Sequence, residues 1–577
     1  MRTRTERPSA GSLRPSEVAR GLQQGAQRPL CGALVAISVA LLFQGCAAWE
    51  DHNVKTRDAR RSFVEGRFDD ALADLEKEKD NKLDGLCFQL DAAVVAQAGG
   101  RFDRSNKDFE QAEQTIQEFE DRGLNGSVIA EDIGSIAVNE KTIPYKGEDF
   151  EKILVPVMRS RNYLLAGNLE DAMVEARRIW IQQDVTKQLH EKELAESNEE
   201  ADKHKIDRSK LGEVEGKVEY PPGALKSPES IYEITYAHWL SGIISEKNGK
   251  IDDAYISVKA ASKIRPDVPF IAADQLRLAL IQGDQENASL LRKKWPSLAL
   301  PGPQDGSIAL LFDCGWAPHK RELKIVLPSF NTFGAIAIPL YDRTPNPAVY
   351  ARLRLNDQVY STAVLSDVDA IAFKYHHKRL PLMVLKQILR TTIKMAAGEG
   401  AAAGVRQGGK SAIGGLAAGL AVGVYNYASE QADLRAWLTL PQTFQAVRVW
   451  VPAGTYEGSV ELCDAGGNVI NAAKLGTITV RPRSLQFAQA RSVDRSLFAA
   501  ICKEAGPPVP VPARGGPKDP PPQSPPVQDT PPPQSPPPPP VQDTPPPPAQ
   551  DTPPPPAPDA PPPPAPDAPP PSDGQPK

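Results

Sequence analysis

Residue types that build metal and nucleophilic sites are scarce in this sequence. It has seven histidines and six cysteines in 577 residues, and the cysteines lack the paired spacing of a zinc site. Neither a His-x-x-x-His pair nor a Gly-x-Ser-x-Gly turn occurs. We therefore expect no catalytic residues, no metal and no cofactor, and we predict that the chain is not an enzyme.

An excess of charge of one sign is also missing. The chain carries 67 basic and 72 acidic residues, a net charge of -5. A mildly acidic chain lacks the basic surface that binds a phosphate backbone, so we expect no nucleic-acid partner. The apolar run at residues 31–43 is too short to span a bilayer as a helix.

That run is instead typical of an export signal. Six arginines precede it, and it ends at Gly45-Cys46. A small residue before a cysteine, after an apolar run, resembles the lipobox that lipoprotein signal peptidase cleaves. We therefore predict a signal peptide at residues 1–45 and a lipid anchor on Cys46, carrying palmitate-like acyl chains. The alternative is an ordinary buried cysteine after an uncleaved anchor.

The residues after the cysteine indicate a location. Several acyl chains together anchor a protein firmly, whereas one alone is marginal. Ala47 and Ala48 follow the cysteine, where lipoproteins kept in the inner membrane usually have Asp. We expect transport to the outer membrane, on its periplasm-facing side, with residues 46–60 as a polar tether.

Residues 61–300 show a helical pattern that repeats. A glycine, then an acidic segment, then a small residue recur, with 34 residues from Gly66 to Gly100 and from Gly249 to Gly283. This period resembles the tetratricopeptide repeat, in which two antiparallel helices form one unit. Glycine permits the tight turn. The predicted turns are Gly66, Gly100, Gly167, Gly249 and Gly283.

Small residues after the turns should let the two helices of each unit approach closely. These predicted packing positions are Ala71, Ala172, Ala254 and Ala288. A plain helical bundle with accidental spacing is the alternative. Residues 186–219 interrupt the array with dense charge and no apolar periodicity, so we expect a solvated helix or a mobile excursion there.

Strand patterns replace helical ones after residue 300, which gives an α+β multidomain fold. We predict a β-rich domain at residues 301–505, with a helical and Gly/Ala-rich insertion at 378–435. Glycines recur at four-residue steps in two runs, Gly400, Gly404 and Gly408, then Gly415, Gly419 and Gly423, a spacing that allows close helix contact. Insertion in a membrane or self-association through this segment is possible, and a buried hairpin or a flexible linker is the alternative.

The last segment, residues 506–577, is dominated by proline. Its natural state is an extended, disordered polyproline II chain. We expect a spacer, with recognition by a groove for Pro-rich ligands as the alternative.

One sequence matches the phosphate-loop pattern but lacks its context. Gly404–Ser411 fits Gly-x-x-x-x-Gly-Lys-Ser, yet no strand pattern leads into it. We therefore expect no nucleotide binding. Cys87, Cys314, Cys463 and Cys502 permit three pairings in an oxidising compartment, and the sequence does not choose among them.

Two further segments are similar to a known family. They are Tyr145-Lys146-Gly147-Glu148-Asp149-Phe150-Glu151-Lys152-Ile153-Leu154 and Ala432-Asp433-Leu434-Arg435-Ala436-Trp437. The family comprises tetratricopeptide-like bacterial lipoproteins, and the resemblance covers roughly residues 46–490. It implies an architecture and a location but no activity. The sequence alone offers no physical reason why the first segment should have a particular role.

The function that we expect from these patterns is a lipid-anchored scaffold. A solenoid of helical repeats presents a concave surface that binds another protein or a peptide. The expected partners are the membrane, through the anchor, and an envelope protein or peptide, through the repeats. The alternative is a membrane-active or oligomerising structural component of the envelope that uses the glycine-rich segment.

Overall fold

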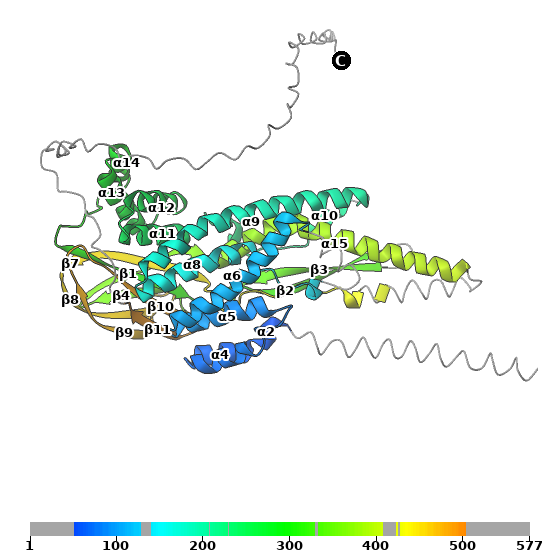
Figure 1. Ribbon diagram of the computed structural model, residues 1–577, viewed down its shortest axis with the longest axis horizontal. Coiled ribbons are helices and arrows are strands. Elements are labelled where there is room, and N and C mark those ends of the chain that lie inside the picture. The colour runs from blue at the N-terminus through cyan, green and yellow to red at the C-terminus, as the bar shows by residue number, and fades with distance from the viewer. Residues whose placement is uncertain are drawn as a thin grey trace, which may run out of the picture. The chain divides into compact units, whose positions relative to one another are not determined.

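The chain folds as a mixed α+β protein, as the sequence predicts. The computed structural model describes residues 51–128, 140–206, 208–228, 230–328, 333–407, 423–424 and 427–502. These residues belong to one compact unit that extends to Arg514. Among the described residues, all helices except α15 precede residue 295, and all strands follow residue 304 (Figure 1). The predicted signal peptide, Cys46 and the Pro-rich tail at 506–577 lie outside the described residues.

The N-terminal helices pack in sequential pairs joined by short turns. The five paired sets are α3 with α4, α5 with α6, α8 with α9, α11 with α12, and α13 with α14. Their bounds are Arg57–Val64, Phe68–Glu76, Gly85–Ala98, Phe102–Asn125, Asp149–Ala166, Leu169–Lys203, Thr235–Lys247, Ile251–Ile264, Pro269–Gln282 and Gln285–Lys294.

Packed structure begins inside residues 46–60, the segment that we expected to be a polar tether. Asp51 caps the short helix α2 (His52–Lys55), and helix α3 follows directly. His52 is buried, and its Nε2 lies 2.9 Å from Oδ2 of Asp91. The polar composition hid this structure because α3 is strongly amphipathic and buries only one side, which includes Phe63.

The charged segment at 186–219 is largely an extension of a repeat helix. Helix α9 continues to Lys203, and the short helix α10 (Ser209–Glu215) follows. One side of this part of α9 is buried at helical spacing, although its residues are mostly polar: Thr186, Leu189, Glu193, Ser197 and Ala201. Apolar periodicity therefore did not reveal this buried helix side, because ion pairs and small side chains make its contacts.

Two sheets pack face to face beyond the helices. The first has the strand order β11-β10-β1-β7-β6 and the second β5-β4-β8-β9. Strand β1 pairs in parallel with β10 and antiparallel with β7. The bounds of the first sheet are Ser496–Ile501, Leu485–Val493, Asp305–Cys314, Thr443–Pro452 and Ala363–Asp367. Those of the second are Gln358–Ser361, Tyr350–Leu355, Gly454–Cys463 and Val469–Val480.

Alternation along β1 places the first sheet between two cores. Ala309 and Leu311 belong to the core that the sheet shares with the helices. Ile308, Leu310 and Phe312 belong to the core between the two sheets. The hydrophobic core thus crosses residue 300, where we expected one domain to end and another to begin.

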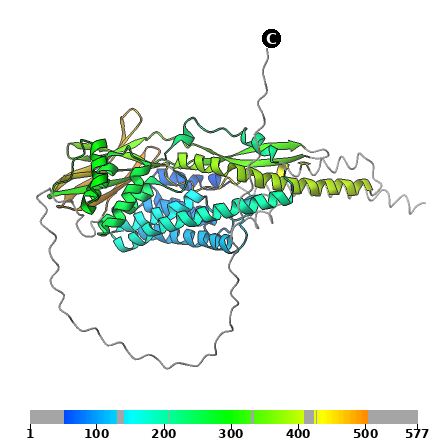
Figure 2. The same cartoon turned by 90° about the horizontal axis from the view of Figure 1, so that it is seen from above.

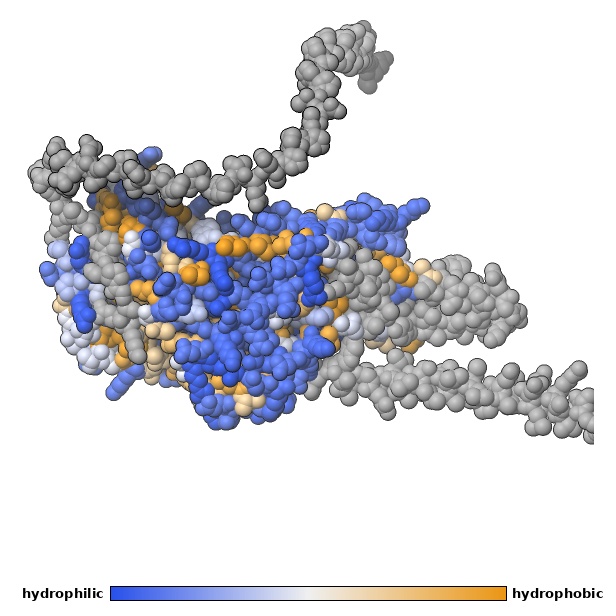
Figure 3. Space-filling view, in the orientation of Figure 1, coloured by the Kyte–Doolittle hydropathy of each residue, from blue (hydrophilic) through white to orange (hydrophobic). Residues whose placement is uncertain are grey.

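The first helices of the three middle hairpins are enclosed by this arrangement. Almost every residue of α5, α8 and α11 is buried, and these helices contribute to the core shared with the sheet. The second helices keep an exposed side. Figure 3 shows a mainly hydrophilic surface over the helices with a short hydrophobic row over α9, where Val174 and Ile181 are exposed.

One long helix separates the strand blocks. Helix α15 (Val368–Gln407) begins ten residues before the insertion expected at 378–435. It lies along the ribbon of β2 (His319–Pro328) and β3 (Phe333–Asp342), as Figure 2 shows. Residues 404–407 are helical, so a helix leads into Gly404–Ser411 where a phosphate loop needs a strand. The segment from 408 to 422 lies outside the described residues.

Three further observations concern the described residues alone. No helix among them is long and apolar enough to cross a membrane. No cluster of three or more histidine, cysteine or acidic side chains there could hold a metal ion. The four cysteines for which three pairings were open, Cys87, Cys314, Cys463 and Cys502, are all free thiols, and all are buried.

Candidate functional site

The predicted repeat turns share one backbone geometry. Gly66, Gly100, Gly167, Gly249 and Gly283 each lie between the two helices of a hairpin, with φ between +72° and +82°. At each turn the residue after glycine donates its N–H to the carbonyl five residues before it, as Arg67 does to Ser62 and Lys250 to Ser245. This is the hydrogen bonding of a Schellman motif, which needs a left-handed residue.

The predicted packing alanines lie at the contact between paired helices. Ala71, Ala172, Ala254 and Ala288 are all buried. In the fourth hairpin, a Cβ on Gly242 would lie 3.4 Å from the carbonyl oxygen of Ala254 and closer still to Val258. These residues build the framework of the hairpins, and none of them lines the cavity described below.

The two segments that carried the family resemblance meet in space. Glu148 caps helix α8, and a reciprocal capping box joins it to Glu151. The Glu151 carboxylate accepts hydrogen bonds from the Tyr145 hydroxyl at 2.5 Å and from the backbone N–H of Trp437 at 2.8 Å. Glu151 therefore links the first segment to the second across 286 residues of sequence.

A buried arginine secures the second segment from the other side. Arg435 donates to Asp433 at 2.8 Å and to the carbonyl oxygens of Leu83 at 2.8 Å and Ile143 at 2.9 Å. One guanidinium thus holds the turn before α5, the chain that enters the first segment, and its own loop together.

Lys320, on β2, completes the junction. Its ammonium group binds the carboxylate of Glu148 and donates to the carbonyl oxygen of Arg435 at 2.8 Å. The same group lies 5.8 Å from the ring centre of Tyr145 and 5.4 Å from that of Tyr341, within cation–π range. An isolated lysine in a strand gives no signal of this role in the sequence.

The two glutamates of the capping box differ in their tendency to ionise. Burial disfavours charge on Glu148, but the ammonium of Lys320 outweighs it and lowers the pKa of that carboxyl. Burial and then the charge of Glu148 raise the pKa of Glu151. Glu148 is therefore the charged partner of Lys320, whereas Glu151 serves the junction chiefly as a hydrogen-bond acceptor.

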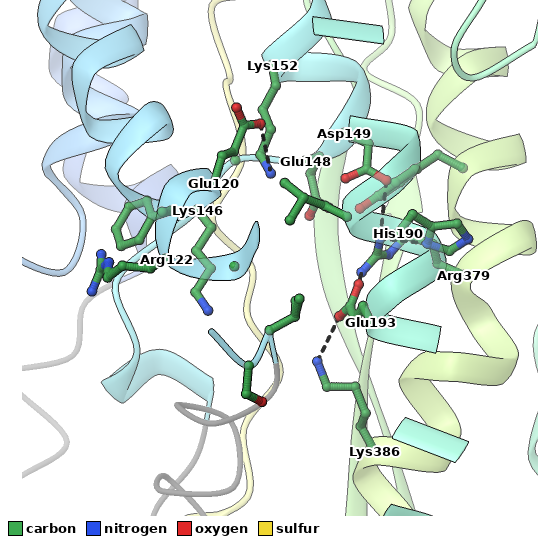
Figure 4. Close-up of a pocket in the computed structure, with 17 residues that line it drawn as sticks. Glu120, Arg122, Lys146, Glu148, Asp149, Lys152, His190, Glu193, Arg379 and Lys386 are labelled. Atoms are coloured by element: carbon green, nitrogen blue, oxygen red, sulfur yellow. Dashed lines mark hydrogen bonds and ion pairs between the residues drawn. The ribbon is translucent and has the colours of Figure 1, made fainter. Parts of the chain in front are cut away.

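A cavity of about 380 Å³ opens beside this junction. Helices α6, α8, α9 and α15 form its walls together with residues 146–148 (Figure 4). Arg379 of α15 lies between Asp149, at 3.2 Å, and Glu193, and its Nη1 is 3.1 Å from Nδ1 of His190. Lys386 binds the other oxygen of Glu193 at 3.0 Å.

The charges of the cavity are arranged by depth. Its carboxylates take part in ion pairs, which include Glu193 with Arg379 and Lys386, and Glu120 with Lys152 at 3.9 Å. The basic side chains of Arg122 and Lys146 line the more accessible side: Arg122 is exposed and Lys146 half-buried. In Figure 4 the side chain of Lys146 extends into the space between the walls. Both of these basic side chains therefore reach the accessible side of the cavity.

This arrangement suits recognition of charged groups. Burial raises the pKa of Glu193, but the nearby cations lower it more strongly. The Glu193 carboxyl therefore stays ionised. The pKa of His190 is lowered by burial and by Arg379, so this ring is neutral near pH 7 and contributes no charge. Fixed ion pairs and two accessible cations can bind an acidic chain segment.

The family resemblance singled out Tyr145–Leu154 and the segment that contains Arg435, but the sequence did not show that the two segments meet. Lys320 and Arg379 come from a strand and a long helix, and nothing in their local pattern marks them. In comparisons with known proteins, no family model matches this chain, and no curated protein matches it.

Proposed function

We propose that this chain is a lipid-anchored lipoprotein of the bacterial envelope that serves as a scaffold for another envelope protein. Acyl chains on Cys46 would hold it at the periplasmic face of the outer membrane. The helical hairpins would be a divergent tetratricopeptide-like array. The single observation that carries the scaffold proposal is the repeated hairpin, with a left-handed glycine at each of its five turns.

The inner face of the array is not where the partner would bind. In a solenoid of helical repeats the first helices line the binding surface. Here those helices, α5, α8 and α11, are buried in the core shared with the sheet. The concave surface expected from the repeats is thus filled by the chain itself, and the partner needs another site.

The cavity beside the junction offers such a site. It borders the array on α6, α8 and α9, and its accessible side carries Arg122 and Lys146. A partner segment rich in Asp or Glu would place its carboxylates against these cations, where charge-assisted hydrogen bonds are shorter and stronger than neutral ones. Steering between unlike charges would also speed the encounter.

The lipid anchor is tested by replacing Cys46 with Ser. We expect Cys46→Ser to abolish labelling by radioactive palmitate and to leave an uncleaved precursor or a protein released from membranes, because the thiol that carries the diacylglycerol is gone. Gel electrophoresis of labelled cells, with fractionated membranes, measures both effects. Equal palmitate labelling of the wild type and the variant would rule out acylation at Cys46.

The partner site is tested by photo-crosslinking in intact cells. A photoreactive amino acid in place of Ser127 should form a discrete adduct with one envelope protein, because this exposed position lines the cavity and leaves both cations in place. The same amino acid in place of Ile256, on the outer side of α12 and 61% exposed, is the matched control and should form no such adduct.

A second substitution links the adduct to charge. We expect Lys146→Glu to reduce the Ser127 adduct at least about tenfold, because it replaces attraction for an acidic segment by repulsion. Immunoblots and mass spectrometry measure the yield and identify the partner. The cavity proposal fails if the two crosslinking positions give the same adducts, or if the yield is unchanged by Lys146→Glu.

A further inference from the structure

A second cavity, of about 400 Å³, lies between the first hairpins and the first sheet. It shares no residue with the cavity beside the junction. Two of its lining side chains are the aromatic rings of Phe68 and Phe498, and its charged ones are Arg161, Asp313 and Arg491. Its volume falls in the range of about 300–1,000 Å³ that small-molecule sites occupy.

The charged end of this cavity is built on paired strands. Asp313 of β1 and Arg491 of β10 are direct neighbours in the parallel pair. Both oxygens of Asp313 lie 2.6 Å from Nη1 of Arg161, which helix α8 supplies. The Asp313 carboxylate therefore pairs with Arg161, although Asp313 lies next to Arg491 in the sheet.

Arg491 lacks a comparable partner. It is only 4% exposed, and its one hydrogen bond is from Nη2 to the carbonyl oxygen of Thr439, at 3.1 Å. Its Nε and Nη1 have no hydrogen-bond partner among the described residues. Its guanidinium carbon lies 5.9 Å from the ring centre of Phe63 and 5.6 Å from that of Trp316. These rings supply cation–π contacts but no hydrogen-bond acceptor.

The cavity therefore holds one positive charge that no side chain among its described lining residues neutralises. Its lining contains two guanidinium groups and one carboxylate. Burial lowers the pKa of Arg491 to about 10, against the opposing charge of Asp313, so the group remains a cation near neutral pH. A buried cation without a counter-ion is costly, and a bound anion removes that cost.

We propose that this cavity binds a small organic monocarboxylate with an apolar body. The carboxylate accepts a hydrogen bond from Nη1 of Arg491, which has no partner among the described residues, and the body lies against Phe68 and Phe498. A single negative charge matches the single unmatched guanidinium, and a guanidinium presents its N–H groups in the geometry that a carboxylate accepts. The apolar walls favour a carbon body over a bare inorganic ion.

Isothermal titration of the full-length chain in a mild detergent tests this site. Phenylacetate is the probe, and 2-phenylethanol is its neutral counterpart of similar shape. We expect saturable binding of phenylacetate, and binding of the alcohol at least about tenfold weaker, because the alcohol cannot neutralise Arg491.

Two variants test whether the ligand binds at Arg491. Arg491→Met should weaken phenylacetate binding at least about tenfold. Arg495→Met removes an exposed arginine from the adjacent turn and should leave the affinity unchanged. Absence of saturable binding to the wild type, or equal affinity for the acid and the alcohol, would overturn the proposal. Equal affinity of Arg491→Met and the wild type would overturn it too. The comparison of the two ligands uses the wild type alone, so it decides the question even if Arg491→Met does not fold.

Discussion

Replacement of Arg448 by Met is expected to lower the free energy of unfolding by about 3–5 kcal/mol. Arg448, on β7, binds Glu246 through both terminal nitrogens, at 2.8 and 3.0 Å, and Asp274 at 2.9 Å. Arg277 binds Glu246 from the other side at 2.6 Å. All four side chains are buried.

The large effect follows from what Arg448→Met leaves behind. Two buried carboxylates would then share one guanidinium, and an uncompensated buried charge costs more than an exposed one. The network also joins helices α11 and α13 to the sheet, so its loss weakens the contact between the helical and the β-rich parts. Urea unfolding of the full chain, followed by circular dichroism, measures the change.

Arg67→Met is the matched control. Arg67 also lies between two carboxylates, those of Glu65 and Asp70, but all three side chains are about half exposed. Exposed ion pairs contribute only about 0–1 kcal/mol, so this variant should unfold close to the wild type. Equal losses in the two variants would show that burial of the Arg448 network does not govern its contribution.

The same network predicts how the Arg448 effect depends on pH. Burial raises the pKa of Glu246, but Arg277 and Arg448 outweigh it and lower that pKa to about 2. The pKa of Glu246 is lower in the folded state than its value of about 4.3 in the unfolded state. The pairing of Glu246 with Arg448 therefore stabilises the wild type above about pH 4.3. That stability is lost as the pH falls toward 2. The difference between the wild type and Arg448→Met should therefore shrink between pH 7 and pH 3.

The second large effect concerns the repeat itself. Ala254→Glu should destabilise the chain by about 3–5 kcal/mol, in the range of severe core failures. Ala254 is completely buried, and α12 approaches α11 so closely there that even a Cβ on Gly242 would contact it. A longer side chain has no room, and its carboxylate would be buried without a partner.

Asp253→Glu provides the comparison for Ala254→Glu. Asp253 is exposed in the first turn of α12, so lengthening its side chain should change the stability by less than about 0.5 kcal/mol. Urea unfolding of the full chain is required, because the helices and the sheet share one core. If both variants unfold at the same urea concentration, Ala254 does not pack as the repeat requires.

Local features of the fold were predictable because each depends on a few neighbouring residues. A turn between antiparallel helices needs a left-handed residue, and Gly100 or Gly249 supplies it with no help from the rest of the chain. Ala172 and Ala288 mark the close approach of paired helices for the same local reason. The change from helices to strands near residue 300 was visible in the periodicity alone.

The tether and the charged excursion show where local reasoning failed. Residues 51–60 and 186–203 are polar in composition, yet each folds into helices with one buried side. Their partners lie elsewhere in the chain: Asp91 for His52, and Arg379 for Glu193. Hydrophobic periodicity cannot reveal a helix side that is buried through ion pairs and hydrogen bonds.

The sequence by itself determined the helical hairpins, their turns and the succession of helical and strand-rich parts, because these follow from short-range sterics and periodicity. Only the tertiary structure decided the surfaces. It covered helices α5, α8 and α11 with the chain's own sheet, joined Glu151 to Trp437, and left Arg491 buried with no counter-ion among the described residues. Burial and charge pairing depend on residues brought together from hundreds of positions apart, and no local pattern records those distances.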